Sequence, residues 1–397
     1  MSSLVLVINA GSSSIKYQLT DAVSGEAVAG GIIERIGQAL SSVKHDGPDG
    51  RTKLEQPVPN HEAGIATILD LFATHGPDLR EVTLTAVGHR VVQGGTRFTG
   101  PAVVDDSVEA AIEEWSALAP LHNPANLSGI RAARAAFPDV PHIAVFDTSF
   151  HSTLPPAAYT YAIDRELARK HSIRRYGYHG TSHQFVSRTT AELLGKDPSE
   201  VNVIVLHLGN GASASAVRGG VCVETSMGLT PLEGLVMGTR SGDLDPAMLI
   251  HLGRVAGMSL DDLDVMLNRE SGMLGMSGFS DMRDIEDAVA AGDVNAITAS
   301  EVYYHRIKGY VGNYYAQLGH VDAIAFTAGI GENDDAVRLN SLAGLGRLGI
   351  EIDPARNKVR SPEPRVISTD GSEVTVFVIP TNEELEIARQ AVALVGA

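Results

Sequence analysis

The chain has 397 residues, with 48 acidic and 31 basic side chains, so its formal net charge is −17. The 44% hydrophobic and 20% charged residues are typical of a globular protein with two or three domains, and they exclude a disordered chain. The acidic balance argues against a nucleic-acid partner, and an enzyme of this charge must gather arginine and lysine locally to bind an anion. The single cysteine, Cys222, excludes an internal disulfide and fits a reducing cytosol. Because the apolar run 4–8 is too short for a signal peptide and no run approaches ~20 residues, we expect neither secretion nor a membrane span.

The first 150 residues show strand patterns first and then alternating helix and strand. Apolar residues 4–9, the alternating segment 15–21 and a third run around 26–30 predict three antiparallel strands joined by tight turns. Helical stripes follow at 61–76 and 106–118, the second with capping-box spacing from Asp106 to Glu109. Strands are expected at 84–92 and 142–147, the latter ending in a carboxylate.

A similar series of elements returns in the second half of the chain. A buried-type strand at 203–208 is followed by a turn of small residues and by another strand near 221–226. INAGSSS (8–14) aligns with LGNGASA (208–214), with Gly11 over Gly211, which indicates an internal duplication. Later, residues 322–333 predict a strand with a Gly-rich turn, and 374–395 predict a strand followed by a helix capped by Thr381 and Glu384.

Three turns of small residues follow buried strands, at 10–14, 209–213 and 328–333, and Lys16 lies just beyond the first. Without bulky side chains, backbone N–H groups can approach an anion closely. Any one of these segments is explained by a tight turn alone. Together they favour a phosphate site, and since the chain lacks the GxxxxGK[ST] motif, that site is not a P-loop.

His179 and His183 are four residues apart, which would suit a zinc pair on one helix face. Residues 180–182 instead look like a turn and N-cap, so we expect the helix to begin after His179. A structural histidine and a catalytic histidine at the helix entrance both stay open.

Arg90 lies in an apolar strand and Arg240 among small residues, where each needs either an acidic partner or a bound carboxylate or phosphate. Asp147 and Glu383 follow predicted strands, where a carboxylate can hold Mg²⁺ or simply cap a turn.

The motifs together resemble those of the acetate kinase family. In chain order they are NAGSSSIK (9–16), GHRVVQGG (88–95), FDTSFH (146–151), YGYHGTSH (176–183), HLGNGAS (207–213), GTRSGDLDP (238–246), SDMRD (280–284), GIGEN (329–333) and TNEE (381–384). They cover nearly the whole chain, and several are six or more residues long, which chance does not explain.

The resemblance implies an α/β fold of the actin, hexokinase and Hsp70-like class, with two lobes built on a duplicated RNase H-like core and a ligand cleft between them. The first lobe would comprise 1–147 with 385–397, and the second, 148–384, would carry most of the nucleotide site. The implied reaction is reversible phosphorylation of acetate by ATP to give ADP and acetyl phosphate, with Mg²⁺ as cofactor or Mn²⁺ in its place. The family also implies a cytoplasmic homodimer without nucleic-acid or membrane partners.

The resemblance assigns roles position by position. Asp147, His179 and Arg240 would be catalytic, and Asn9 and Glu383 would order the metal. The residues for the acyl substrate would be Arg90, Val92, Leu121, Tyr178 and Pro231. Those for ATP would be Ser12, Ser14, Lys16, His207, Leu208, Gly209, Asn210, Gly211, Asp281, Met282, Arg283, Gly329, Ile330, Gly331, Glu332 and Asn333.

Two positions depart from the common family pattern: Gln93 replaces a histidine, and Tyr178 replaces a phenylalanine. The Tyr178 hydroxyl adds a polar group to the expected acyl pocket, so propionate and butyrate stay alternative substrates. An actin- or Hsp70-like ATPase would share the fold without needing an arginine and a histidine around a small pocket. A sugar kinase would need a carboxylate base and polar sugar contacts, whereas the expected pocket is apolar.

Overall fold

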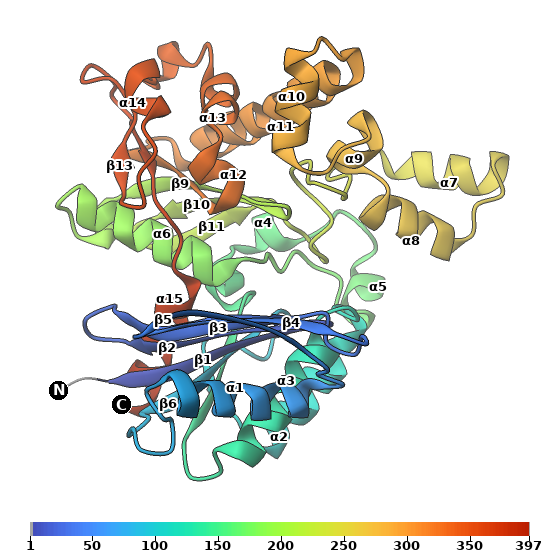
Figure 1. Cartoon of the computed structure of the whole chain (residues 1–397). Coiled ribbons are helices and arrows are strands. Elements are labelled where there is room, and N and C mark those ends of the chain that lie inside the picture. Colours follow the sequence, from blue (N-terminus) through green and yellow to red (C-terminus); the bar gives the residue numbers. More distant parts are fainter. Residues whose placement is uncertain (1–2, 397) are drawn as a thin grey trace. The chain divides into compact units, whose positions relative to one another are not determined.

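The computed structural model describes residues 3–396 and divides into two compact units, each with its own sheet (Figure 1). The first unit comprises Met1–Ser152 and Asn382–Ala397, and the second comprises Thr153–Thr381. The chain therefore returns to its first unit for its last helix. The lobe boundaries expected after residues 147 and 384 stay a prediction.

An eight-stranded sheet in the order β5-β4-β3-β2-β1-β6-β8-β7 forms the first unit. The pairs from β5 through β1 are antiparallel. The pairs β1–β6 and β6–β8 are parallel, and β7 is antiparallel to β8. The strands are Leu4–Gly11 (β1), Ser14–Asp21 (β2), Ala27–Glu34 (β3), Ser41–Gly47 (β4), Gly50–Gln56 (β5), Ala86–Val91 (β6), Ala102–Val103 (β7) and His142–Phe146 (β8).

The three expected antiparallel strands are confirmed as β1, β2 and β3, but the antiparallel run continues through β4 and β5, which were not expected. The outermost strand, β5, buries none of its residues, and its sequence GRTKLEQ is polar. A strand that packs against no core carries little of the apolar alternation on which the prediction depended.

The helices of the first unit are His61–His75 (α1), Asp106–Glu114 (α2), Asn123–Ala136 (α3) and Glu383–Val395 (α15), with 3₁₀ turns at Trp115–Ala117 (η1) and Ser149–Thr153 (η2). Two predicted caps were wrong by one residue. Helix α2 is capped by Asp105, which accepts a hydrogen bond from the N–H of Val108 at 2.8 Å. Helix α15 is capped by Asn382, not Thr381. An N-cap needs non-helical backbone, and Asp105 is extended at φ −124°, whereas Asp106 already belongs to the helix.

Helix α15 packs on the central strands of the first unit. Ile387, Ala388 and Ala391 are buried in one cluster with residues of β1, β6 and β8. A Cβ at Gly88 on β6 would lie 2.7 Å from Ile387, so only glycine allows this close approach. This packing fixes the helix start, with its carboxylates, beside the end of β6.

The second unit has a six-stranded sheet in the order β11-β10-β9-β12-β14-β13. Its strands are Asn202–Leu208 (β9), Ala212–Arg218 (β10), Val221–Thr225 (β11), Ala323–Thr327 (β12), Arg365–Val366 (β13) and Thr375–Val378 (β14). Strands β11-β10-β9-β12-β14 repeat the order and directions of β3-β2-β1-β6-β8: two antiparallel pairs, then two parallel ones. The internal duplication is therefore confirmed.

Helices surround this second sheet. They are Pro156–Tyr159 (α4), Arg165–Lys170 (α5), Gly180–Leu193 (α6), Pro246–Val255 (α7), Leu260–Arg269 (α8), Gly272–Ser277 (α9), Met282–Ala290 (α10), Val294–Leu318 (α11), Ala328–Asn333 (α12), Asp335–Leu342 (α13) and Pro354–Lys358 (α14), with 3₁₀ turns at Pro198–Glu200 (η3) and Gly346–Leu348 (η4). Residues 328–333 form a short helix, not the Gly-rich turn expected. Within residues 3–396, no helix is both long enough and apolar enough to span a membrane.

Candidate active site

In the first unit, three neighbouring parallel strands end in polar side chains. Asn9 lies near the end of β1, Arg90 near the end of β6, and Asp147 directly after β8, where its N–H donates to the carbonyl of Val91 at 2.9 Å. Parallel strands present their carboxyl ends at one edge of a sheet, where α/β proteins bind ligands. The structure thus gathers three predicted site residues at this edge.

Arg90 makes a bidentate ion pair with Asp147. Its Nε and Nη2 donate to the two carboxylate oxygens at 3.0 and 2.6 Å, and Glu383 Oε2 lies 3.8 Å from Nε. Burial alone would lower the pKa of Arg90, but the Asp147 and Glu383 carboxylates outweigh it and raise that pKa. Asp147 is only 1% exposed and is engaged by a guanidinium, so the ion-pair interpretation of Arg90 holds in this structure.

Lys16 and Glu384 form a second ion pair in this unit, with 2.5 Å between Nζ and Oε1. Lys16 lies opposite Asn9 in the β1–β2 register. Glu384 was expected to act in the helix cap, whereas the structure pairs it with Lys16.

The oxygens of Asn9, Asp147 and Glu383 are of the types that Mg²⁺ prefers. Among residues 3–396, no cluster of three or more His, Cys, Asp or Glu side chains could hold a metal. A protein cage is therefore not built in the described chain, but Mg²⁺ typically uses one or two carboxylates together with substrate phosphates. The residues present fit that mode of binding.

In the second unit, histidines and serines form one hydrogen-bonded network. His179 is the N-cap of α6, with the left-handed φ of +58° that non-glycine residues rarely adopt. Its Nδ1 lies 2.9 Å from Ser213 Oγ, and its ring stacks on His207 at 4.2 Å. His183 contacts Ser213 and Ser215 through its two ring nitrogens, at 2.7 and 2.8 Å.

These contacts bear on the alternatives for the two histidines. The helix begins after His179, as expected. His183 has both ring nitrogens within hydrogen-bond distance of serines, and no group of three or more possible metal ligands is found among residues 3–396, which argues against the zinc pair. Strained backbone concentrates at functional sites, and the φ of His179 fits that pattern.

Arg240 differs from Arg90 in having no acidic partner. Its Nη1 donates to the carbonyl of Pro231 at 2.6 Å, and no carboxylate of residues 3–396 forms an ion pair with it. Burial lowers the pKa of Arg240. A Cβ at Gly211 would lie 2.9 Å from Arg240 Nη2 and 3.5 Å from His179 Nε2. We call His179, Gly211 and Arg240 the anion site, because a partly buried guanidinium without a carboxylate is stabilised by a bound anion.

A pocket of about 600 Å³ lies within the second unit. Helix α10, which begins with Asp281 as its N-cap, forms one wall, and α12 forms another. Seven predicted nucleotide residues line the pocket: Asn210, Asp281, Met282, Arg283, Gly329, Ile330 and Asn333. The other predicted nucleotide residues of this unit do not line it: His207, Leu208, Gly209, Gly211, Gly331 and Glu332. Of these, Glu332 accepts the N–H of Thr381 through Oε1 at 3.2 Å.

Four further residues line this pocket and were not predicted: Ser280, Glu286, Asp334 and Arg360. Burial raises the pKa of Asp334, and burial together with the charge of Asp334 raises that of Glu286. Glu286 follows Met282 by one helical turn, and Asp334 directly follows the GIGEN motif, so the sequence could have predicted that both lie near the nucleotide residues. Arg360 lies in a loop far along the chain from these motifs, and no sequence pattern pointed to it.

The predicted acyl residues belong to both units. In the first unit, Val92 is 6% exposed and Leu121 is 55% exposed. In the second, Pro231 accepts from Arg240, and the Tyr178 hydroxyl donates to the carbonyl of Leu229 at 2.7 Å. The extra hydroxyl relative to the family pattern is thus bonded to the chain itself.

Solved structures share this fold over their full length. Porphyromonas gingivalis acetate kinase matches with a TM-score of 0.94 and 41% identity, covering 99% of each chain. A propionate kinase from Francisella tularensis matches with a TM-score of 0.92 and 40% identity, covering 98% of each. The fold is therefore a mixed α/β fold with two sheets, of the kind found in these kinases.

The sequence comparisons are more specific. Residues 4–389 match the acetokinase family. Relatives named acetate kinase include those of Leifsonia xyli, 59% identical with 100% of both chains covered, and of Clavibacter michiganensis, 60% identical with 98% of both covered. The chain belongs to the acetokinase family.

Proposed function

We propose that this protein is an acetate kinase, which transfers the terminal phosphoryl group of ATP reversibly to acetate. The observation that carries the proposal is the anion site: Arg240, without an acidic partner, lies with His179 around Gly211. Asn210, the residue before Gly211, lines the 600 Å³ pocket. A nucleotide in that pocket would therefore have its phosphates close to the anion site.

The nucleotide would occupy the pocket between α10 and α12. Its lining combines backbone of small residues with the side chains of Asp281, Arg283 and Asn333, which suits a ribose and a base edge. From the first unit, the small-residue turn with Ser12 and Ser14, followed by Lys16, would approach the terminal phosphates.

The chemistry follows from the charges. Acetate is ionised at neutral pH and needs no strong base, so catalysis depends on positioning two anions in line and neutralising the moving phosphoryl group. Arg240 and His179 would stabilise that group, and Arg90 would hold the carboxylate. Asp147 is engaged by Arg90. It therefore orients groups and does not abstract a proton.

Mg²⁺ belongs to this proposal, with Asn9 and Glu383 ordering it and Asp147 nearby. When bound, the ion neutralises phosphate charge and orients the nucleotide. The ion pair between Lys16 and Glu384 would keep the second carboxylate of the α15 start away from the metal.

Acetate is the proposed acid because relatives that are 59–60% identical over nearly the whole chain are named acetate kinase. Propionate kinase is the second candidate, favoured by the 40% identity to a named propionate kinase. An extra methylene in an apolar pocket changes discrimination by only about 1–3 kcal/mol, so we expect a graded preference.

A cytoplasmic homodimer completes the proposal. Helices α7 and α8 expose large apolar side chains, among them Ile250, Val255 and Leu260 at 56, 72 and 84%. Such a surface is typical of an interaction site and suits a second copy of the chain.

The test is hydroxylamine trapping of acyl phosphate with ATP, Mg²⁺ and acetate, propionate or butyrate. We expect kcat/KM to fall in that order, and Val92→Ala to raise the propionate-to-acetate ratio. A higher kcat/KM for propionate than for acetate would assign a propionate kinase instead, and an unchanged ratio in Val92→Ala would remove that residue from the pocket.

A further inference from the structure

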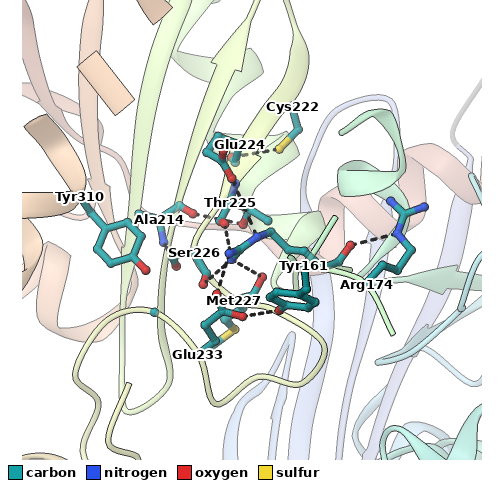
Figure 2. A network of polar contacts seen from close by, with 12 residues as sticks. Tyr161, Arg174, Ala214, Cys222, Glu224, Thr225, Ser226, Met227, Glu233 and Tyr310 are labelled. Atoms are coloured by element: carbon teal, nitrogen blue, oxygen red, sulfur yellow. Dashed lines mark hydrogen bonds and ion pairs between the residues drawn. The ribbon is translucent and has the colours of Figure 1, made fainter. Parts of the chain in front are cut away.

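The segment 226–245, between β11 and α7, carries both Pro231 and Arg240. It contains no helix or strand, and it is held by backbone hydrogen bonds to other parts of the unit, such as that from the N–H of Gly238 to the carbonyl of Asn210, together with side-chain contacts. Figure 2 shows the polar contacts around the first part of this segment. They involve the carbonyl groups of Thr225, Ser226 and Met227 and the side chain of Glu233.

The guanidinium of Arg175 makes those contacts. Its Nη1 donates to the carbonyls of Thr225, Ser226 and Met227 at 2.9, 3.0 and 3.4 Å, and its Nη2 donates to Glu233 Oε1 at 2.6 Å. One side chain therefore bonds three successive carbonyls at the start of the segment and the carboxylate of Glu233, which lies further along it. Arginine suits this task because its donors form a rigid planar fork.

Glu233 is held from its other side as well. Its Oε2 accepts a hydrogen bond from the hydroxyl of Tyr161 (Figure 2). The Tyr161 oxygen in turn accepts a hydrogen bond from the N–H of Leu229 at 3.0 Å. A Cβ at Gly228 would lie 1.8 Å from Glu233 Oε2 and 2.1 Å from the Tyr161 hydroxyl. The segment thus passes directly against this polar pair, and no side chain fits between them.

The backbone that follows Arg175 leads to His179. Along it, the N–H of Tyr176 donates to the carbonyl of Gly228 at 3.0 Å, and the hydroxyl of Tyr178 donates to that of Leu229. The stretch 175–179 and the segment 226–245 are therefore fastened together, and Arg175 provides the charged part of that fastening.

We infer that Arg175, anchored by Glu233 and Tyr161, is a positioning residue that sets the place of Arg240 relative to His179. The inference rests on the proposed function, in which Arg240 and His179 act on the moving phosphoryl group. In this role Arg175 acts through its bonds to the backbone carbonyls and to Glu233 of the segment. A displacement of about 1 Å at a reacting group can reduce the rate by about 10²-fold.

The later part of the segment has its own anchors. Asp243 accepts from the N–H of Gly234 at 2.8 Å and from the hydroxyl of Tyr310 at 2.7 Å, and Arg306 donates to the carbonyl of Gly234 at 3.0 Å. Loss of the Arg175 contacts should therefore shift the segment and leave the unit folded.

The test uses Arg175→Lys, which keeps the charge near Glu233 but cannot bond three carbonyls and a carboxylate together. We expect kcat to fall about 10-fold or more while the KM for acetate changes less than about threefold. Tyr161→Phe removes the hydroxyl that anchors Glu233 and accepts the N–H of Leu229 but keeps Arg175, so it should reduce kcat by a smaller factor in the same pattern. Arg356→Lys is the matched control, because Arg356 also bonds a carbonyl and a carboxylate, those of Ser368 and Asp370, far along the chain. It should leave both constants unchanged.

A double-mutant cycle separates positioning from a general structural role. In an Arg240→Met background, Arg175→Lys should reduce kcat less than twofold, because the group that it positions is gone. An equal reduction in both backgrounds, or a KM effect as large as the kcat effect, would overturn the inference. If Arg240→Met keeps wild-type activity, the proposed role of Arg240 fails instead. If Arg175→Lys unfolds, Tyr161→Phe carries the same cycle.

Discussion

Substitution of Arg90 should destabilise the protein much more than substitution of Arg240, since Arg90 has a buried acidic partner and Arg240 has none among residues 3–396. We consider Arg90→Met and Arg240→Met, which remove the charge and keep an unbranched apolar side chain. Both should reduce kcat/KM by about 10²–10³-fold, the scale for losing a group that stabilises transition-state charge, or about 2.7–4 kcal/mol. The two variants should differ in stability.

Removal of Arg90 leaves Asp147, 1% exposed, without its bidentate partner. Breaking a buried ion pair in this way costs about 3–5 kcal/mol, which for a unit of this size lowers Tm by roughly 10 °C. Removal of Arg240 loses one hydrogen bond, to the carbonyl of Pro231, and relieves the burial of a charge. We therefore expect a Tm within about 2 °C of wild type.

The assay is kcat/KM for acetate together with thermal unfolding of the free protein at neutral pH. Arg90→Lys serves as a further control, because it restores one ion pair to Asp147 without the bidentate geometry, and it should recover part of the lost Tm. An Arg240→Met variant that loses as much Tm as Arg90→Met, while keeping its activity, would refute the reasoning and make Arg240 a structural residue.

Three further predictions follow from the described contacts. Gly211→Ala should reduce kcat by about 3–10-fold, because its Cβ would lie 2.9 Å from Arg240 Nη2 and displace that atom by a few tenths of an ångström. Gly312→Ala, whose Cβ would meet nothing within 4 Å, is the control, and the same kcat in both variants would contradict the anion site. Glu383→Gln should raise the Mg²⁺ concentration for half-maximal activity by about 10-fold, and a titration curve superimposable on that of wild type would remove Glu383 from the metal site. Burial lowers the pKa of His89 and of His142, whose ring nitrogens lie 2.9 Å apart, so below a pH of about 6.5 the unfolded chain binds more protons than the folded one and the free energy of unfolding falls as the pH drops. His89→Gln should flatten this part of a curve of Tm against pH.

The sequence predicted β1, β2, β3, β6, β8, β9, β11, β12 and β14, because each carries an apolar run or a clear alternation. It missed two strands that bury residues, β4 and β10, and the small residues of β10 suggested only a turn. The edge strand β5 was missed because its residues face solvent and show no such pattern. The cap of α2 was misplaced by one residue since Asp105 and Asp106 are both good capping residues, and only the backbone conformation distinguishes them.

In the candidate site, too, some features were predictable from the sequence and others were not. The family resemblance predicted seven of the residues that the structure gathers around one pocket. It could not decide whether Arg90 and Arg240 pair with acids, because the partner of Arg90 lies 57 residues away and is brought near by the β6–β8 pairing. The contacts of Arg175 depend on backbone carbonyls, which every residue carries, so no sequence pattern reveals them.

The central claim is that the chain phosphorylates a carboxylate and does not simply hydrolyse ATP. The most direct measurement is the amount of ADP and of trapped acyl hydroxamate formed in the same reaction, with and without acetate. We expect one hydroxamate per ADP and almost no ADP without acetate. ADP released at the same rate in the absence of acetate, with no hydroxamate in its presence, would contradict it.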